Sequence, residues 1–380
     1  MSTEIAIAEK QRISLNQLKT KCVNLFIFGH GNVGGNLLDQ VLEGLEVIAE
    51  RKRIQLRIVA IVNSRKAIIS AEGIRGDWRK RLETNGTNWD IGQIIDFARS
   101  HTLNNCIAVD NTASRQFVDN YSALIAGGFH LVSSNKIGNT LELGFYKQLR
   151  QLLENHDREY LYETNVGAGL PLIDTIKLLH LSGENITRIR GIFSGSLSYI
   201  FNTFSEEEKS FSTIVRSAVT NGLTEPDPRE DLCGNDVGRK LLILARELDL
   251  HNELEDVQIE NLVPDFLRNV DASVFLDRLT ELDPIFSEKK KNLKEGEVLR
   301  YVADLRGDLS VHDKAVLEVK LKSVSAEDAL AQVSGSDSVF QIYTENYGSN
   351  PIVIKGAGAG GAVTARGVLG DILRLSEKLH

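Results

Sequence analysis

Short apolar runs alternate with amphipathic helical patterns over about the first 150 residues of the chain. The apolar runs predict strands, and they cover Cys22–Phe28, Leu56–Val62, Cys106–Val109 and His130–Val132. The first run leads directly into GHGNVGG and then into apolar positions at helical spacing. Strands and helices that alternate in this way predict a parallel sheet with helices on both faces, so the fold class is α/β.

The pattern changes after about residue 150. Ile186–Phe193 reads as a strand, helical patterns follow it, and four strand-like runs come later, with period-2 alternation in VLEVKLK. We therefore expect an α+β region over residues 156–355. The last segment, 356–380, is a glycine turn followed by a helix, and we expect it to complete the first domain, residues 21–155. Residues 1–20 are read as an N-terminal extension.

Composition narrows the class of protein. The chain has 380 residues, 42% of them apolar, which is enough for two or three packed units. A formal net charge of -8 without a basic stripe argues against a nucleic-acid partner. No run approaches the ~20 apolar residues of a membrane span, and the N-terminus lacks a signal-peptide core. The three cysteines show neither disulfide nor metal-ligand spacing. We expect a cytoplasmic protein that acts on small molecules.

Three glycines, Gly29, Gly31 and Gly34, stand in the order G-x-G-x-x-G between the first predicted strand and a predicted helix, with Asn32 and Val33 among them. The first glycine permits the tight turn, the second lets the backbone approach a pyrophosphate, and the third lets helix and strand pack closely. The amides at the helix start then face the anion. A glycine-rich turn without a ligand is the alternative. The strand before it and the helix after it favour a dinucleotide-binding Rossmann domain.

The end of the second predicted strand indicates which dinucleotide binds. A site for NAD usually has Asp or Glu there, whereas this chain has Asn63 followed by Ser64, Arg65 and Lys66. Two cations and a hydroxyl would attract a 2′-phosphate through charge-assisted hydrogen bonds. NADP(H) is therefore favoured, and NAD(H) stays open. Thr112, in VDNTAS at the end of another strand, is expected to flank the nicotinamide.

Charged residues crowd between 221 and 247, just before an amphipathic helix. Asp236 and Lys240 are four residues apart and share one helix face; such a pair is most often an exposed salt bridge contributing about 0.3–0.5 kcal/mol. Hydride transfer from an alcohol carbon also needs a proton acceptor, and a lysine with pKa ~10.4 serves only if burial or a second cation lowers that value. Lys136, which ends SSNK, would supply that cation, and Glu225 would take a substrate ammonium group.

Seven motifs then occur in a fixed order: GHGNVGG, VDNTAS, SSNK, YETNVGAGLP, GIFSGSLSYIF, TEPDPREDLCGNDVGRK and GAGAGGAVTARGVLGD. Together they resemble the homoserine dehydrogenase family over residues 21 to 380. The chain is most similar to the dehydrogenase half of bifunctional aspartokinase–homoserine dehydrogenases, but it contains no kinase. The resemblance implies a Rossmann domain, a dimerisation sheet, and reversible NAD(P)-dependent interconversion of L-homoserine and L-aspartate 4-semialdehyde in threonine and methionine biosynthesis.

The resemblance also assigns residues to the active site. Lys240 is implied as the proton donor or acceptor and Lys136 as its partner near the substrate oxygen, although which lysine is the acid–base group stays open. Gly222, Glu225 and Asp236 match substrate-binding positions. The small-molecule substrate would then be held by the same helix start that carries Lys240.

Further implications concern the cofactor, a cation and the assembly. Gly360 is implied to close on the cofactor, and Glu163, Val166, Ala168 and Leu170 match a loop that binds sodium. A homodimer is expected, and an aspartokinase partner in trans is left open. Monofunctional bacterial members of the family often carry a C-terminal regulatory domain, whereas this sequence stops at His380, so threonine feedback through such a domain is not expected.

Two alternative functions remain to be tested. A semialdehyde dehydrogenase that works through a thioester needs an activated cysteine, but Cys106 lies inside a predicted strand and Cys233 lies in the acidic loop, neither beside an evident histidine base. The other alternative is a non-catalytic NADP-binding subunit. The presence of Glu225, Asp236 and Lys240 argues against it.

Overall fold

The computed structural model describes residues 20–379, and its first half is built on a six-stranded sheet with the order β3-β2-β1-β4-β5-β6. All neighbouring strands are parallel except β3, which is antiparallel to β2. The strands are β1 (Lys21–Phe28), β2 (Ile54–Val62), β3 (Ala67–Ile69), β4 (Cys106–Asp110), β5 (His130–Ser133) and β6 (Tyr160–Leu161). Because the parallel strands end at the same edge, the segments that follow them lie together there.

Helices and short turns connect these strands. They are α2 (Asn32–Lys52), α3 (Trp78–Asn85), α4 (Ile91–Ser100), α5 (Arg115–Val118), α6 (Tyr121–Ala126), η1 (Ile137–Asn139), α7 (Leu143–Asn155) and η2 (Glu163–Asn165). The strand interiors are almost wholly buried, as expected for a sheet covered on both faces. None of the helices among residues 20–379 is long and apolar enough to cross a bilayer.

A second six-stranded sheet, with the order β12-β11-β7-β9-β10-β8, follows in the chain. Its strands are β7 (Ile186–Ile192), β8 (Gln258–Ile259), β9 (Glu297–Gly307), β10 (Ala315–Ser325), β11 (Asp337–Thr344) and β12 (Ile352–Ala357). Only β8 and β10 pair in parallel. Tyr301, Ala303 and Leu305 of β9 enter the main core, whereas Val302 belongs to a small separate cluster, so the two faces of this sheet have different surroundings.

The helices of this half are α8 (Ile173–Leu181), α9 (Gly195–Glu206), α10 (Phe211–Thr220), α11 (Arg229–Leu232), α12 (Asn235–Arg246), α13 (Asp265–Arg268), α14 (Ala272–Asp277) and α15 (Asp283–Lys291), with the short turns η3 (Leu254–Asp256) and η4 (Leu279–Leu282). Of these, α9 and α12 pack directly on the sheet. On α12 the buried stripe includes Val237, Leu241 and Leu244, so this helix is fixed firmly on β9 and β10.

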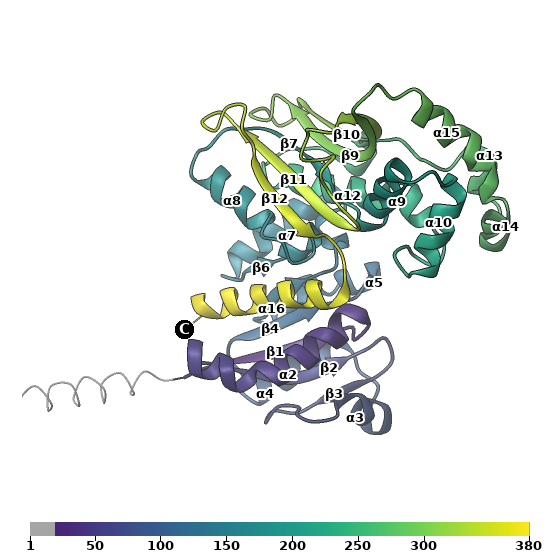
Figure 1. Ribbon diagram of the computed structural model, residues 1–380. Helices are drawn as coiled ribbons and strands as arrows, with labels where there is room; N and C mark the ends of the chain where they lie inside the picture. Colours follow the sequence, from purple (N-terminus) through teal and green to yellow (C-terminus); the bar gives the residue numbers. More distant parts are fainter. Residues whose placement is uncertain (1–19, 380) are drawn as a thin grey trace, which may run out of the picture.

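The last helix, α16 (Gly361–Lys378), returns to the first sheet and packs beside α2 (Figure 1). Ile372 and Leu375 of α16 join Leu38 and Val41 of α2 in one apolar core, and all four side chains are fully buried. The Lys21 ammonium, at the start of β1, donates to the carbonyl of Ser376. The end of the chain is thereby part of the same packed unit as its beginning.

The predicted fold class is confirmed: the molecule is mixed α/β, with a Rossmann-type sheet and a second α+β part. The four predicted strands of the first half occur within two residues of their expected bounds. Pattern analysis missed β3 and β6, which are only three and two residues long. Since β6 pairs with β5, the first sheet extends past the predicted boundary at residue 155. Residues 1–19 of the expected N-terminal extension lie outside the described residues.

Candidate active site

The glycine turn between β1 and α2 has the geometry of a phosphate cradle. Gly29 has φ +83°, and a Cβ there would meet the Asn111 backbone at 2.9 Å. A Cβ on Gly34 would lie 2.0 Å from the Gly29 carbonyl oxygen, whereas one on Gly31 would meet nothing within 4 Å. The packing of the surrounding backbone therefore requires glycine at positions 29 and 34. At Gly31 the absence of a side chain leaves open space before the helix amides. That space fits an anionic ligand.

A second helix start lies beside this cradle. Gly360 precedes α16 with φ +120°, and a Cβ on Gly361 would lie 2.2 Å from the Oδ1 atom of Asn32, the first residue of α2. The Gln40 side chain also donates to the carbonyl of Ala362 at 2.9 Å. Neither helix has a side-chain cap on its first amides. Two positive helix ends are thus brought close together, at the place where the sequence predicts a cofactor.

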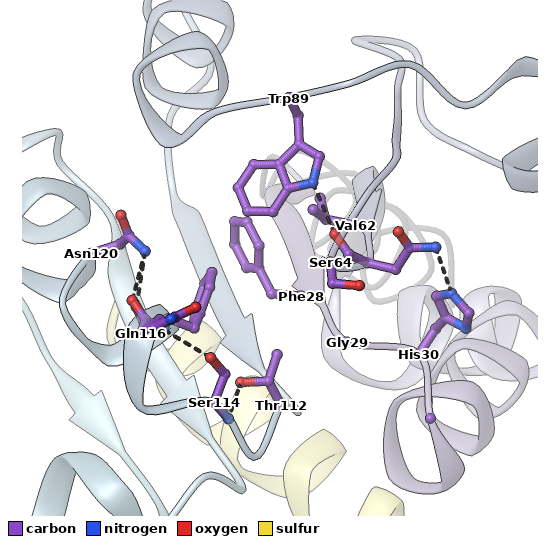
Figure 2. A pocket seen from close by; sticks show the side chains of 13 residues that line it. Phe28, Gly29, His30, Val62, Ser64, Trp89, Thr112, Ser114, Gln116 and Asn120 are labelled. Carbon is purple, nitrogen blue, oxygen red and sulfur yellow. Dashed lines mark hydrogen bonds between the residues drawn. The ribbon is translucent and has the colours of Figure 1, made fainter.

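A cavity of about 400 Å³ opens from the cradle along the sheet edge. Figure 2 shows its lining side chains, among them Ser64, Trp89 and Thr112. The Trp89 indole donates to the Asn63 carbonyl at 2.8 Å, which fixes the ring over the end of β2. The amide of Thr112 donates to the buried Asp110 carboxylate at 2.8 Å. The predicted Ser64 and Thr112 therefore line one cavity.

A second cavity, of about 450 Å³, adjoins the first through His30 and Asn63. Its lining includes Arg65, Lys66 and Arg79. Arg79 makes two hydrogen bonds to Asp39, at 2.9 and 2.7 Å, and the Lys66 ammonium donates to the carbonyl of Glu83. Three cations thus border a hollow at the end of β2. Sequence reasoning found the first two but missed Arg79 and Trp89, because no spacing rule links them to β2.

Two lysines from different halves of the molecule meet at one carboxylate. The Lys136 ammonium lies 3.3 Å from one oxygen of Asp236, and the Lys240 ammonium lies 2.8 Å from the other. Lys240 also donates to the carbonyl of Phe193 at 2.8 Å, at the end of β7. The side chains are 29% exposed for Lys136, 11% for Lys240 and 49% for Asp236, so the group is partly open to solvent.

The electrostatics of this group are dominated by the two cations. The protein around the exposed Asp236 carboxylate displaces part of its water, which would raise its pKa, but the charges and hydrogen bonds of Lys136 and Lys240 lower that pKa well below its ordinary value. Asp236 therefore stays a carboxylate throughout the neutral range. The arrangement offers two ammonium donors to one oxygen atom and a fixed negative charge that orients them.

The acidic loop before α12 is organised by carboxylates that sequence reasoning left without a role. Asp231 accepts from the Ser196 hydroxyl at 2.6 Å and from the Glu225 amide at 2.9 Å, and burial raises the pKa of Asp231. Asp227 pairs with Arg229, whose guanidinium also donates to the carbonyl of Val270. The predicted Glu225 side chain is exposed beside this framework.

Gly222, the other predicted substrate position, lies at the far end of the same loop. It is exposed and has φ +65°, a conformation that favours glycine. The structure therefore places both predicted positions on the exposed loop before α12, and Asp236 follows at the start of that helix.

The predicted sodium loop, residues 163–170, is a buried turn between β6 and α8. Both oxygens of the Glu163 carboxylate accept backbone amides, from Ile173 at 2.7 Å and Asp174 at 2.9 Å, so this side chain caps α8. Burial, together with the nearby Asp371, raises the pKa of Glu163 to about 7. Among the described residues no cluster of three or more His, Cys, Asp or Glu side chains is suited to a metal ion.

The carbonyl oxygens of the same loop behave differently. Those of Val166 and Ala168 accept no hydrogen bond from the described part of the chain, whereas that of Leu170 accepts from the Leu172 amide. Ala168 has φ +55°, which is uncommon for a residue with a Cβ. Two free carbonyl oxygens in a strained turn are the kind of ligand that hard cations take.

The cysteines lack the surroundings of a nucleophile. Burial raises the pKa of the Cys106 thiol to about 12, and burial also raises that of Cys233. The Cys106 thiol faces the carbonyl of Leu103, and the Cys233 thiol faces that of Glu230. Since the thiolate is the reactive form, neither environment favours thioester chemistry.

Comparisons with known proteins agree with this geometry. Residues 29–163 match the family described as "Homoserine dehydrogenase, NAD binding domain", and residues 171–373 match "Homoserine dehydrogenase". The homoserine dehydrogenase of Schizosaccharomyces pombe is 35% identical over 368 residues, covering 94% of this chain and 96% of that protein. The chain belongs to the homoserine dehydrogenase family. Members of this family are NAD(P)-dependent oxidoreductases that act on a CH–OH group.

Two further proteins are similar to this chain over most of its length. The bifunctional aspartokinase/homoserine dehydrogenase of Haemophilus influenzae is 38% identical over 357 residues, or 93% of this chain. The chain spans only 43% of that relative's length. A solved structure from Candida auris, described as of unknown function, is 31% identical, with a TM-score of 0.84 over 94% of this chain and 99% of that one.

The different surroundings of Gly31 and Gly34 lead to a testable contrast. Gly34→Ala should destabilise the fold by about 1–3 kcal/mol or more, because backbone atoms must move to admit the methyl group. Gly31→Ala should keep the stability of the parent but weaken NADP(H) binding about 10-fold or more, the usual effect of a methyl-sized misfit. Urea denaturation and cofactor fluorescence titration measure the two quantities. Equal cofactor affinity in Gly31→Ala and the parent would contradict the cradle.

Proposed function

We propose that this chain catalyses the reversible NAD(P)-dependent interconversion of L-homoserine and L-aspartate 4-semialdehyde. The observation that carries the proposal is the group of Lys136, Asp236 and Lys240, which joins the edge of the cofactor-binding sheet to α12. The bound nicotinamide would accept hydride from the alcohol carbon or return it to the aldehyde. A protein that only binds NADP has no need of this group.

The residues present divide the remaining work. In the direction of alcohol oxidation, we assign the removal of the substrate hydroxyl proton to the Lys240 amine after its ammonium has released a proton to solvent. Lys240 is the less exposed lysine, and Phe193 and Asp236 position its nitrogen. Lys136 donates a hydrogen bond to the same oxygen. Glu225, on the exposed loop before α12, takes the substrate ammonium group, and Gly222 permits the turn of that loop.

The activity is tested by following absorbance at 340 nm with homoserine and NADP. Lys240→Ala should lower kcat by about 10²–10⁴, the usual effect of losing a positioned proton-transfer group, with cofactor affinity kept. Lys209→Ala is the control, because this lysine is 59% exposed and pairs only with Glu207. Near-normal turnover in Lys240→Ala would remove the role assigned to it. Cofactor binding without any absorbance change in the parent would favour the non-catalytic alternative.

We further propose that NADP(H) is preferred over NAD(H). The support is the cavity lined by Arg65, Lys66 and Arg79, which adjoins the cofactor cavity. Glu83 also lines it, but residues 63–66, which follow β2, include no acidic side chain. A 2′-phosphate would be neutralised there by charge-assisted hydrogen bonds. Ser64, on the wall of the first cavity, would contact the adjoining ribose.

For this preference, Arg65→Ala should weaken NADP binding by about 10-fold or more, since hydrogen bonds to charged groups contribute about 1.5–3 kcal/mol, and should leave NAD binding nearly unchanged. Isothermal titration with both cofactors measures the difference. Arg99→Ala, which removes a 73% exposed arginine paired with Asp96, is the matched control. Equal losses for NADP and NAD would refute the assignment.

The sodium site stays a proposal that rests on main-chain atoms. The carbonyls of Val166 and Ala168 would hold the ion, with Glu163 and Leu170 completing the loop. Sodium should then raise the melting temperature more than choline at the same chloride concentration, because an ion that binds only the folded state stabilises it. Differential scanning calorimetry measures this, and identical melting temperatures in the two salts would count against a site here.

The assembly and location are also proposals. We propose a homodimer formed through the second sheet, where charges such as Arg188, Asp304 and Glu318 lie on the face away from the main core. Light scattering that gives a monomer mass would exclude the homodimer.

An aspartokinase partner is tested by copurification. A cytoplasmic location is supported by the three unpaired cysteines, and cell fractionation tests it.

A further inference from the structure

Lys136 stands at the start of a segment with little structure of its own. It precedes η1, a single 3-10 turn, and its carbonyl accepts from the Asn139 amide at 3.0 Å and the Thr140 hydroxyl at 3.2 Å. The segment then runs through Leu141 into α7. The buried Asn135 side chain fixes the segment before Lys136, accepting from the Ile137 amide at 3.1 Å and donating to Asp110 at 3.0 Å. Because so short a turn has few backbone bonds of its own, the position of Lys136 also depends on what anchors the residues that follow it.

Arg150 bonds the Asn139 side chain at 2.8 Å, and Arg246, the last residue of α12, anchors the backbone of the segment. One of its terminal nitrogens donates to the carbonyl of Asn139 at 2.9 Å and to that of Leu141 at 2.6 Å. The other pairs with Glu253 at 2.9 Å, and the second oxygen of Glu253 accepts from the Leu143 amide at 2.7 Å. The Arg246 side chain is only 1% exposed. Burying a guanidinium costs free energy unless such bonds offset it.

Arg239 lies on the same face of α12, seven residues and two turns before Arg246. Its guanidinium donates to the Thr140 hydroxyl at 3.2 Å. The same helix carries Asp236 and Lys240 in its first turns, and Asp236 and Arg246 are separated by about 15 Å at 1.5 Å per residue. One rigid helix therefore holds the acid–base group at one end and grips the Lys136 segment with its arginines.

We propose that Arg246 is a positioning residue that sets the placement of Lys136 opposite Asp236 and Lys240. Its side chain is buried and lines neither of the two cavities at the sheet edge, and it acts through the carbonyls of Asn139 and Leu141. The proposal rests on the proposed function, since it concerns the alignment of that active site. No other described side chain bonds both carbonyls.

A double-mutant cycle in the full chain tests this role. Arg246→Met removes the guanidinium at similar length and should lower kcat for homoserine oxidation by about 10- to 100-fold, the scale of a 1 Å misplacement. In a Lys136→Ala background the same change should cost almost nothing further, because the residue through which it acts is gone. Hydrogen exchange read by mass spectrometry should show faster exchange over residues 137–143 in Arg246→Met.

The matched control is Arg300→Met. Arg300 is 2% exposed and also donates to backbone carbonyls, those of Leu330 and Ala331, but it lies on β9. This variant should lose thermal stability while its effect on kcat is the same with and without Lys136. If Arg246→Met does not fold, Arg246→Lys replaces it. A lysine keeps the positive charge but lacks the two terminal nitrogens of the guanidinium group, so we expect a smaller loss of kcat with the same dependence on Lys136.

Two results would overturn the proposal. The first is an equal loss of kcat from the Arg246 substitution in both backgrounds, which would indicate a purely structural role. The second is unchanged exchange over residues 137–143. If the parent protein fails to oxidise homoserine, the proposed function is wrong, while the exchange measurement still decides whether Arg246 holds the segment.

Discussion

The sharing of the Asp236 carboxylate by two ammonium groups is the interaction on which the proposed chemistry depends. Lys136 follows a strand of the first sheet, whereas Lys240 and Asp236 belong to a helix packed on the second. Separations of 3.3 and 2.8 Å between charged atoms tolerate little movement of one half against the other. The rest of the architecture keeps the two halves in a fixed position relative to each other, so that these distances are maintained.

Burial supplies most of that rigidity. The apolar stripe of α12, with Leu241 and Leu244, fixes the helix on the second sheet, and α16 packs its own stripe against α2 on the first. Side chains on α12 then reach the Lys136 segment, and the start of α16 reaches Asn32. Of these two helices, α12 links the second half to the first, whereas α16 joins the end of the chain to the first half itself.

Much of the fold was predictable because its signals are local. Apolar runs and helical spacing reflect backbone preferences that act within a few residues, so the strands before Gly29 and Ser64 were found close to their true bounds. The strands β3 and β6 were missed because two or three residues are too few to show the alternation of apolar and polar positions that predicts a strand. Glu163 was read as a cation ligand, whereas its carboxylate also caps α8, ten residues later, a contact that only the fold of the intervening turn reveals.

The sequence by itself determined the dinucleotide-binding turn, the helix that carries Asp236 and Lys240, and membership of a family, because these are properties of contiguous residues. Only the tertiary structure decided that Lys136 meets Asp236, that Arg79 joins Arg65 at one hollow, and that Arg246 holds the segment after Lys136. These partners are separated by between 14 and about 110 positions along the chain, and no local preference encodes such distances. They arise when burial of the helix stripes brings the two sheets together.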